Sequence, residues 1–223
     1  YSVNVAWAKR AVDKRTKVIF IASPNNPSGN VMPEADLIEL LGTGLAVVVD
    51  EAYFEFSGKT SVSLVQRHPN LMVLRTFSKW AGLAGLRVGY GVFSRDVADL
   101  LLRMKPPYNM NVAAQVAAQE SLADLDYLRA NVQRIVEERP RLKDGLDNVG
   151  FLKTFPSEAN FILCAVRKGS AGRLKGDLAS RGILVRYFDT PLLRNMIRIS
   201  VGKPEHTDSV LQALAEIGKE FGG

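Results

Sequence analysis

Short, unbroken runs of apolar residues constrain the fold of this 223-residue chain more than any other feature. Four of them lie at residues 17–22, 45–50, 71–76 and 88–93, each about the length of one strand, and the second ends in the carboxylate of Asp50. A sheet with one face in water would alternate apolar and polar residues, whereas unbroken runs are typical of strands buried on both faces. The runs predict an α/β fold with a mostly parallel sheet that is covered on both faces.

Segments with helical character separate and follow these runs. Pro33 suits the first turn of a helix, and Glu34 and Asp36 favour a helix start at the same place. Pro140 lies inside the longest helical segment and is expected to kink or end it. The predicted helices cover residues 34–41, 96–103, 112–122 and 124–146.

Beyond Gly150 the pattern becomes typical of a smaller α+β domain. The predicted order is strand 160–164, helix 171–181, strand 183–187, strand 196–201 and helix 205–221. We therefore expect two domains, a large α/β domain at residues 1–123 and a small carboxyl-terminal domain at residues 124–223.

Composition narrows the classes of function. The chain is 47% hydrophobic and 23% charged, as a globular protein is. Its 29 Lys and Arg outnumber its 23 Asp and Glu, but they are dispersed and no helix-turn-helix pattern occurs, so we expect anionic small molecules rather than nucleic acid as ligands. The longest apolar stretch, residues 37–49, contains Glu39 and is too short to span a bilayer, so no membrane partner is expected.

Cysteine and histidine usage bears on metals and compartment. Cys164 is the single cysteine, which excludes an intramolecular disulfide and a multi-cysteine zinc site, and we interpret it as a small core residue. His68 and His206 are too isolated to form a metal-ligand pattern, so no metal is expected. We expect a cytoplasmic protein, or an organellar one if a targeting segment precedes this chain.

Polar residues follow three of the predicted strands at once. Asn25 and Asn26 come after the first, Asp50 and Tyr53 after the second, and the pair 78–79, serine and lysine, after the third. Ligands of open α/β sheets bind beyond the carboxyl ends of the strands. An amide, a carboxylate, a phenol and an amine are thus expected at one edge of the sheet.

Each of these side chains also has a purely structural interpretation. Asparagine-rich segments form tight turns, an aspartate can cap the next segment, and a tyrosine can simply pack. Most lysines are solvated, and arginines such as Arg87 and Arg198 can form surface ion pairs. Any one of the residues alone is weak support for a site, and their combination carries the functional interpretation.

The combination matches the chemical needs of pyridoxal phosphate. A lysine amine can form a Schiff base with an aldehyde, a carboxylate can keep a pyridine nitrogen protonated, and an arginine can clamp a phosphate. A protonated ring withdraws electrons when a substrate carbon loses its proton, and the same lysine can serve as the base.

Four motifs then occur in the order found in fold type I pyridoxal-phosphate aminotransferases of the class I/II group. They are residues 23–29, 49–53, 76–90 and 197–202. The chain resembles this family over essentially its whole length. The resemblance implies the transferase fold of that family, with a partial large domain and a small carboxyl-terminal domain. It also implies that the amino-terminal part of the family's chain is absent here.

The resemblance implies roles for individual residues around the cofactor ring. Lys79 would carry the cofactor and shuttle the proton, and Asp50 would pair with the pyridinium nitrogen. Asn26 and Tyr53 would hydrogen-bond the phenolate oxygen of the ring.

Further roles concern the phosphate of the cofactor and the substrate. Ser78 and Arg87 would hold the cofactor phosphate, with Thr76 as a further candidate. The substrate-binding candidates are Arg198 for the α-carboxylate, Arg186 for a substrate phosphate, and Asn160, which either lines the pocket or satisfies local backbone. Arg186 could instead form an interdomain salt bridge.

Within the class I/II group, segments such as 50–56, 74–79, 157–163 and 198–202 are similar to histidinol-phosphate aminotransferases. This implies amino-group transfer between L-histidinol phosphate and 2-oxoglutarate, in histidine biosynthesis, by a homodimer. Alternatives are an aromatic or broad-specificity aminotransferase, a phosphothreonine decarboxylase, and a cofactor-binding regulatory module or inactive fragment.

Overall fold

The computed structural model describes residues 1–221 and divides the chain into two compact units. Unit 1 comprises residues 1–26 and 30–130. Unit 2 comprises residues 27–29 together with the chain from residue 131 onward. The short segment 27–29 therefore leaves unit 1 directly after Asn26 and belongs to the other unit.

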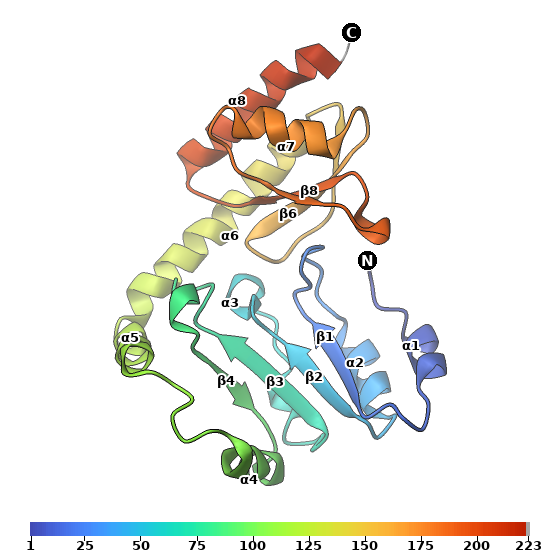
Figure 1. Ribbon diagram of the computed structural model, residues 1–223, viewed down its shortest axis with the longest axis vertical. Coiled ribbons are helices and arrows are strands. Elements are labelled where there is room, and N and C mark those ends of the chain that lie inside the picture. Colours follow the sequence, from blue (N-terminus) through green and yellow to red (C-terminus); the bar gives the residue numbers. More distant parts are fainter. Residues whose placement is uncertain (222–223) are drawn as a thin grey trace. The chain divides into compact units, whose positions relative to one another are not determined.

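A four-stranded sheet in the order β1-β2-β3-β4 is the framework of unit 1 (Figure 1). Its strands are β1 (Val18–Ala22), β2 (Ala46–Asp50), β3 (Leu71–Thr76) and β4 (Gly89–Val92). The first three run parallel, as the apolar runs predict, while β4 pairs antiparallel with β3. The connection from β3 to β4 contains only a 3₁₀ turn, Ala84–Leu86, and lacks the long helix that usually carries a parallel crossover.

The register of unit 1 aligns the carboxyl ends of its parallel strands. Ala22 of β1 lies opposite Asp50 of β2, and Asp50 lies opposite Leu74 of β3. Residues that follow these three strands therefore start from the same edge of the sheet.

The helices of unit 1 are α1 (Val5–Ala11), α2 (Glu34–Leu41), α3 (Phe54–Ser57), α4 (Arg95–Met104) and α5 (Val112–Ala123). Helices α1 and α2 contribute buried residues to the core beside the sheet. Leu40 of α2 is fully buried with Val47 and Leu71 of the sheet. The sequence pattern predicts α2, α4 and α5 to within one residue at either end, but it missed α1 and α3, which are single short segments of two turns or fewer.

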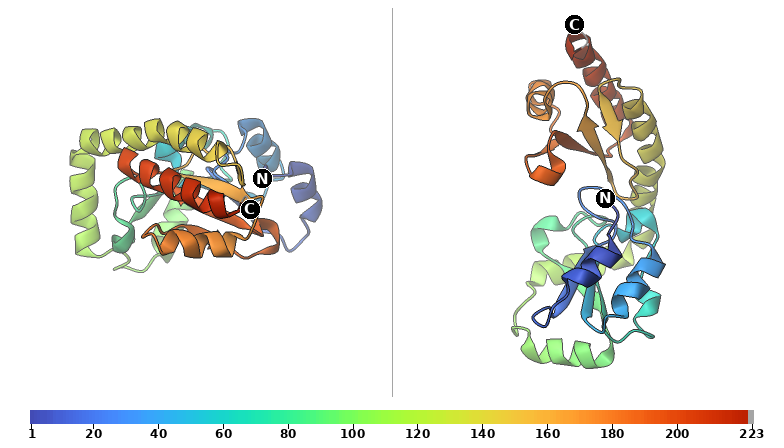
Figure 2. Two further views of the ribbon diagram at one scale, coloured as in Figure 1. Left: turned by 90° about the horizontal axis from the view of Figure 1, so that it is seen from above. Right: turned by 90° about the vertical axis from the view of Figure 1, so that its right-hand side faces the viewer.

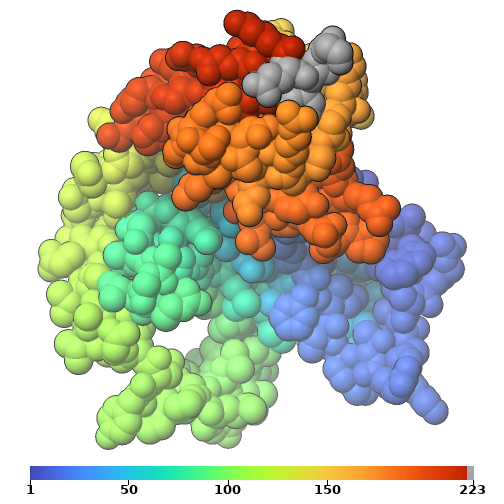
Figure 3. Space-filling model, turned by 45° about the horizontal axis from the view of Figure 1, so that its top comes forward, coloured from blue at the N-terminus to red at the C-terminus, as the bar shows by residue number. Residues whose placement is uncertain are grey.

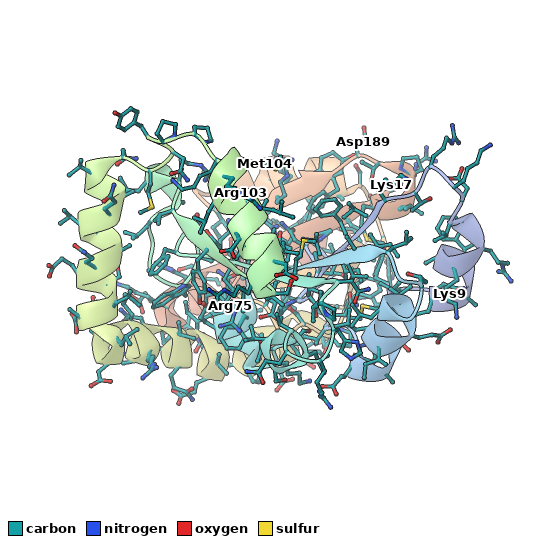
Figure 4. All side chains as sticks on the ribbon, turned by 90° about the horizontal axis from the view of Figure 1, so that it is seen from below. Lys9, Lys17, Arg75, Arg103, Met104 and Asp189 are labelled. Atoms are coloured by element: carbon teal, nitrogen blue, oxygen red, sulfur yellow. The ribbon has the colours of Figure 1, made fainter. Side chains whose placement is uncertain are left out.

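Part of unit 1 is more exposed than the apolar runs predict. Phe20 in β1 is 75% exposed, so the prediction that this strand is buried on both faces is wrong. The reason is that β1 is an edge strand of the sheet. Helix α4 has no buried residue. Its Leu102 and Met104 line an open cavity of about 590 Å³ together with Gly89 and Gly91 of β4 (Figures 3 and 4).

Unit 2 is built on an antiparallel sheet in the order β5-β6-β8-β7, consistent with the predicted α+β pattern (Figure 1). Its strands are β5 (Leu152–Thr154), β6 (Phe161–Val166), β7 (Arg186–Phe188) and β8 (Met196–Ser200). Its helices are α7 (Ala171–Ala179) and α8 (Pro204–Phe221), together with the larger part of α6 (Leu125–Asp147) (Figure 2). Strand β7 begins three residues later than predicted, and β5 was not predicted.

The core of unit 2 is dense and apolar. Ile162 of β6, Leu174 of α7, Ile197 of β8 and Leu214 of α8 are all fully buried. Helix α6 continues past Pro140 to Asp147, so this proline does not end it. Cys164 is also buried, which raises the pKa of its thiol to about 12 and fits the prediction of a core residue.

Segment 27–29 joins unit 2 through a close backbone approach. The N–H of Glu158 donates to the carbonyl oxygen of Gly29 at 2.8 Å. Gly29 has a φ of +80°, and a Cβ at this position would lie 2.1 Å from Ser157 Oγ. Only glycine fits both the conformation and the space.

Residues 1–221 lack two features. No helix in this part of the chain is long and apolar enough to cross a membrane. No group of three or more His, Cys, Asp or Glu side chains in the same part is placed to hold a metal ion.

Candidate active site

Four predicted site residues lie at the carboxyl edge of the parallel strands in unit 1. Asp50 is the last residue of β2, Tyr53 precedes α3, and Asn26 and Lys79 lie on the loops after β1 and β3. Asn26 Nδ2 lies 3.5 Å from the Tyr53 hydroxyl, within reach of a long hydrogen bond. Lys79 Nζ lies 5.8 Å from the centroid of the Tyr53 ring. The structure thus brings an amide, a phenol and an amine together, as the strand topology predicts.

Asp50 is held in place by the backbone around it. Its Oδ1 accepts a hydrogen bond from the N–H of Ala52 at 2.9 Å, and its carbonyl oxygen accepts one from Ser23 at 2.9 Å. The residue is nevertheless exposed. Its carboxylate is therefore fixed in direction and accessible to a ligand at the sheet edge.

The candidates for phosphate binding follow β3. The Thr76 hydroxyl accepts a hydrogen bond from the N–H of Ser78 at 3.0 Å and lies 2.8 Å from Ser78 Oγ. Thr76 Oγ1 also lies 3.2 Å from the carbonyl oxygen of Val88. Thr76 therefore orients Ser78, which is a role distinct from direct contact with a phosphate.

Arg87 adopts an unusual backbone conformation. Its φ is +58°, in the left-handed region that residues other than glycine seldom occupy. Its Nη1 donates to the carbonyl oxygen of Ala84 at 3.0 Å, and the residue is exposed. Such conformations cluster at ligand-binding positions, where the surrounding structure compensates for their cost.

A buried ion pair beside these residues was missed at the sequence level. Glu51 is 1% exposed, and its Oε2 accepts hydrogen bonds from Arg75 Nε at 3.0 Å and Arg75 Nη2 at 2.9 Å. Thr60 Oγ1 donates to the same carboxylate, and the N–H of Ser61 donates to its Oε1 at 2.6 Å. One signal was available: Arg75 interrupts an otherwise apolar strand, where a charge needs a partner.

The surroundings raise the pKa of both Arg75 and Glu55, but for different reasons. Burial disfavours the charged form of Arg75, but hydrogen bonds and charges from Tyr90 and Glu51 outweigh it and raise the arginine's pKa. Burial raises the pKa of the Glu55 carboxyl to about 7, against the smaller opposing effects of its own backbone and of Arg75. Glu55 Oε2 is buried without a hydrogen-bond partner. The Glu55 carboxyl therefore changes its charge near neutral pH.

The substrate-binding candidates lie in unit 2. Arg186 of β7 and Arg198 of β8 are directly opposite each other in the antiparallel pair, so both lie on one face of that sheet. The guanidinium carbon of Arg198 lies 4.7 Å from the centroid of the Phe161 ring. Like charges in opposite positions repel each other, which favours an anion bound near them.

Asn160 precedes β6 and has one clear structural role. Its carbonyl oxygen accepts a hydrogen bond from the N–H of Val201 at 2.9 Å, which joins the start of β6 to the end of β8. The residue is half-buried. This bond is made by the main chain, so the Asn160 side chain is still a candidate either for the substrate pocket or for local backbone.

A family model described as aminotransferase class I and II matches residues 1–216 of this chain. A histidinol-phosphate aminotransferase of Dehalococcoides mccartyi is 51% identical to it over 219 residues. That alignment covers 98% of this chain and 61% of the relative. The chain thus spans about three fifths of the length of this curated relative.

Solved structures show the same fold. The histidinol-phosphate aminotransferase from Clostridium acetobutylicum has a TM-score of 0.90 at 25% identity, with coverage of 98% of this chain and 69% of that one. The histidinol-phosphate aminotransferase from Sinorhizobium meliloti, in complex with pyridoxal-5'-phosphate, has a TM-score of 0.84 at 28% identity. That match covers 97% of this chain and 60% of the solved one.

Proposed function

The chain belongs to the aminotransferase class I and II family, and we propose from this premise that it carries the lysine-bearing part of a pyridoxal-phosphate-dependent histidinol-phosphate aminotransferase. The proposed reaction moves an amino group between L-histidinol phosphate and 2-oxoglutarate. The single observation that carries the proposal is the placement of Asn26, Tyr53 and Lys79 at one sheet edge, with Asp50 beside them. A homodimer, the assembly that the resemblance implies, is part of the same proposal.

The residues at this edge fit pyridoxal phosphate by their chemistry. The cofactor needs an amine for its aldehyde, a carboxylate for its ring nitrogen, donors for its ring oxygen and a cation for its phosphate. Lys79, Asp50, Tyr53 and Arg87 supply one of each, and all four belong to unit 1. The exposure of Lys79, Asp50 and Arg87 leaves these polar groups accessible to a ligand.

When bound, pyridoxal phosphate supplies a ring that withdraws electrons from the reacting carbon of the substrate. Lys79 would hold the cofactor through its Nζ, and the same amine would move the proton at that carbon. Asp50 keeps the ring nitrogen protonated, because a carboxylate stabilises the positive charge beside it. Asn26 and Tyr53 donate hydrogen bonds to the oxygen of the ring.

Phosphate binding is assigned to the segment after β3. Ser78 and Arg87 hold the cofactor phosphate, and Thr76 acts by orienting Ser78 through its hydroxyl. Arginine suits this role because its planar guanidinium can donate two parallel hydrogen bonds to a phosphate.

Unit 2 contributes the groups for the substrate. Arg198 binds the α-carboxylate of glutamate or 2-oxoglutarate through a bidentate pair of hydrogen bonds. L-Histidinol phosphate has an alcohol in place of that carboxylate, so Arg198 cannot make the same bidentate pair of hydrogen bonds with it. Arg186 is assigned to its phosphate, and the cross-strand position of the two arginines supports a shared preference for anions.

The test is a titration of the purified chain with pyridoxal phosphate, followed by borohydride reduction and mass-spectrometric mapping of the modified lysine. The expected result is saturable binding with a single modified residue, Lys79. The control is Lys17→Ala, which removes an exposed lysine in the loop before β1 (Figure 4) and should leave the titration unchanged. Modification spread over several lysines, or none at Lys79, would contradict the proposal.

A further inference from the structure

Glu51 and Arg75 form the buried ion pair that the proposed reaction does not use. We propose that these two are positioning residues, which hold the segment from Asp50 to Tyr53 against the strand that leads to Lys79. The inference rests on the proposed function for what is positioned, and on the geometry of unit 1 for how.

The first step concerns where the backbone hydrogen bonds of the sheet end. The N–H of Glu51 donates to the carbonyl oxygen of Leu74 at 2.8 Å, which continues the pairing of β2 with β3 by one residue. The next residues turn away into α3, which begins at Phe54. Tyr53 therefore lies in a segment that the sheet itself does not hold.

The second step is that the Glu51 side chain anchors the segment where the hydrogen bonds of the sheet end. Its carboxylate receives two hydrogen bonds from Arg75 of β3, and others from Thr60 and Ser61 of the loop after α3. Arg75 Nη2 also donates to Thr60 Oγ1 at 2.6 Å. One carboxylate thus fastens the Asp50–Tyr53 segment to the neighbouring strand and to the following loop.

The third step is the position of Arg75 in the chain. It lies one residue before Thr76 and four before Lys79. Its guanidinium carbon lies 3.6 Å from the centroid of the ring of Phe54, the residue after Tyr53. The guanidinium therefore contacts Glu51, the residue after Asp50, and Phe54, the residue after Tyr53. Arg75 itself belongs to β3, the strand that leads to Lys79.

A purely stabilising role explains the pair less well. Replacing a buried ion pair by well-packed apolar residues is often neutral or stabilising, because removing two charges from water is costly. Here, in contrast, two N–H groups of one planar guanidinium donate to the same oxygen, Glu51 Oε2, which fixes direction as well as distance. Burial lowers the pKa of Arg75, but hydrogen bonds and charges from Tyr90 of β4 and from Glu51 outweigh it, so residues from two neighbouring segments act on the same guanidinium.

The test measures amide hydrogen exchange in the chain without cofactor, for wild type, Glu51→Gln and Arg75→Lys. Arg75→Lys keeps the charge but loses the planar guanidinium with its two donors to Glu51 Oε2. The expected result is exchange that is about tenfold faster at residues 51–56 and 76–79, with β2 residues 46–49 unchanged. Glu138→Gln is the matched control, since Glu138 is a mostly buried glutamate that pairs with Arg141 in unit 2.

Two exchange results would overturn the inference. Wild-type exchange at 51–56 in both variants would show that the pair holds nothing in place. Uniformly faster exchange throughout unit 1, including 46–49, would show a general stabilising role.

A second readout links the pair to the cofactor. The dissociation constant for pyridoxal phosphate should rise about tenfold in Glu51→Gln and Arg75→Lys and stay at the wild-type value in Glu138→Gln. Unchanged affinity in both site variants would contradict the positioning role. Failure of the wild-type chain to bind at Lys79 would instead count against the proposed function, and the exchange data would still decide whether the segment is held.

Discussion

The two units of this protein position their candidate site residues in different ways. In unit 1 the candidate groups Asn26, Asp50, Tyr53 and Lys79 lie at or just beyond the ends of parallel strands. In unit 2 the candidate arginines lie within the strands, opposite each other on β7 and β8. Parallel strands all end at one edge, so loops can gather groups there, whereas neighbouring antiparallel strands end at opposite edges. A cluster in an antiparallel sheet is therefore built from cross-strand pairs.

The strands also differ in how far they are buried. In β6 of unit 2 five of six residues are buried, whereas in β1 of unit 1 only Ile21 is. Unit 2 is thus expected to depend on its apolar core for stability, and unit 1 to tolerate change in its edge strand. The predictions below test this division of roles.

The largest effect is expected at Lys79. Lys79→Ala removes the amine that we propose holds the cofactor and moves the proton, so turnover should fall by at least about 10³-fold with every substrate. Steady-state rates with L-histidinol phosphate and with glutamate give the measurement, and Lys17→Ala is the control. Transamination that survives in Lys79→Ala would assign the amine role to another residue.

The next effect concerns the core of unit 2. Ile162→Ala removes a fully buried side chain of this core and should lower the free energy of unfolding by about 3 kcal/mol. Phe20→Ala removes a side chain that is 75% exposed and should change it by less than about 0.5 kcal/mol. Denaturant unfolding of both variants measures these two changes in the free energy of unfolding. Equal losses of unfolding free energy in the two variants would show that β6 and β1 do not differ in their contribution to stability.

Arg198→Ala separates the two halves of the reaction. It should slow the glutamate half-reaction about 100-fold, because the α-carboxylate loses its charged partner, and slow the histidinol-phosphate half-reaction much less. Single-turnover kinetics of each half-reaction give the comparison. Arg194→Ala, at an exposed arginine four residues earlier, is the control. Equal slowing of both halves would contradict a carboxylate-specific role for Arg198.

The smallest expected effect is a dependence on pH in unit 1. The folded-state pKa of Glu55 is about 7, above its ordinary value of 4.5, so its contribution to stability is complete below about pH 4.5 and is lost as the pH rises through 7. Allowing for the part of the carboxyl that faces solvent, the loss is roughly 2 kcal/mol. Unfolding free energies of wild type and Glu55→Gln across this range give the difference. Parallel pH curves for the two proteins would show that Glu55 is not perturbed.

Much of the fold follows from local patterns. The apolar runs predicted all four strands of unit 1, and the helical segments predicted α2, α4 and α5. The short elements α1, α3 and β5 were missed, because two turns or three residues carry too little periodicity. Buried β1 was predicted wrongly, since an apolar run does not reveal whether a strand lies at the edge of its sheet.

The candidate site divides in the same way. The identities of Asn26, Asp50, Tyr53 and Lys79 and their positions after strands were available from the chain itself. The Glu51–Arg75 pair was not, because residues 24 positions apart meet only when β2 and β3 lie side by side. The left-handed conformation of Arg87 was likewise invisible to a pattern of residue types.

The sequence by itself determined which chemical groups this protein possesses and, through strand order along the chain, which of them start from the same sheet edge. Only the tertiary structure decided the antiparallel direction of β4, the pairing of Arg186 with Arg198 and the burial of Glu51. The physical reason is that residue type and spacing act locally. Burial, strand direction and ion pairing depend on segments that are distant in sequence and become neighbours only on folding.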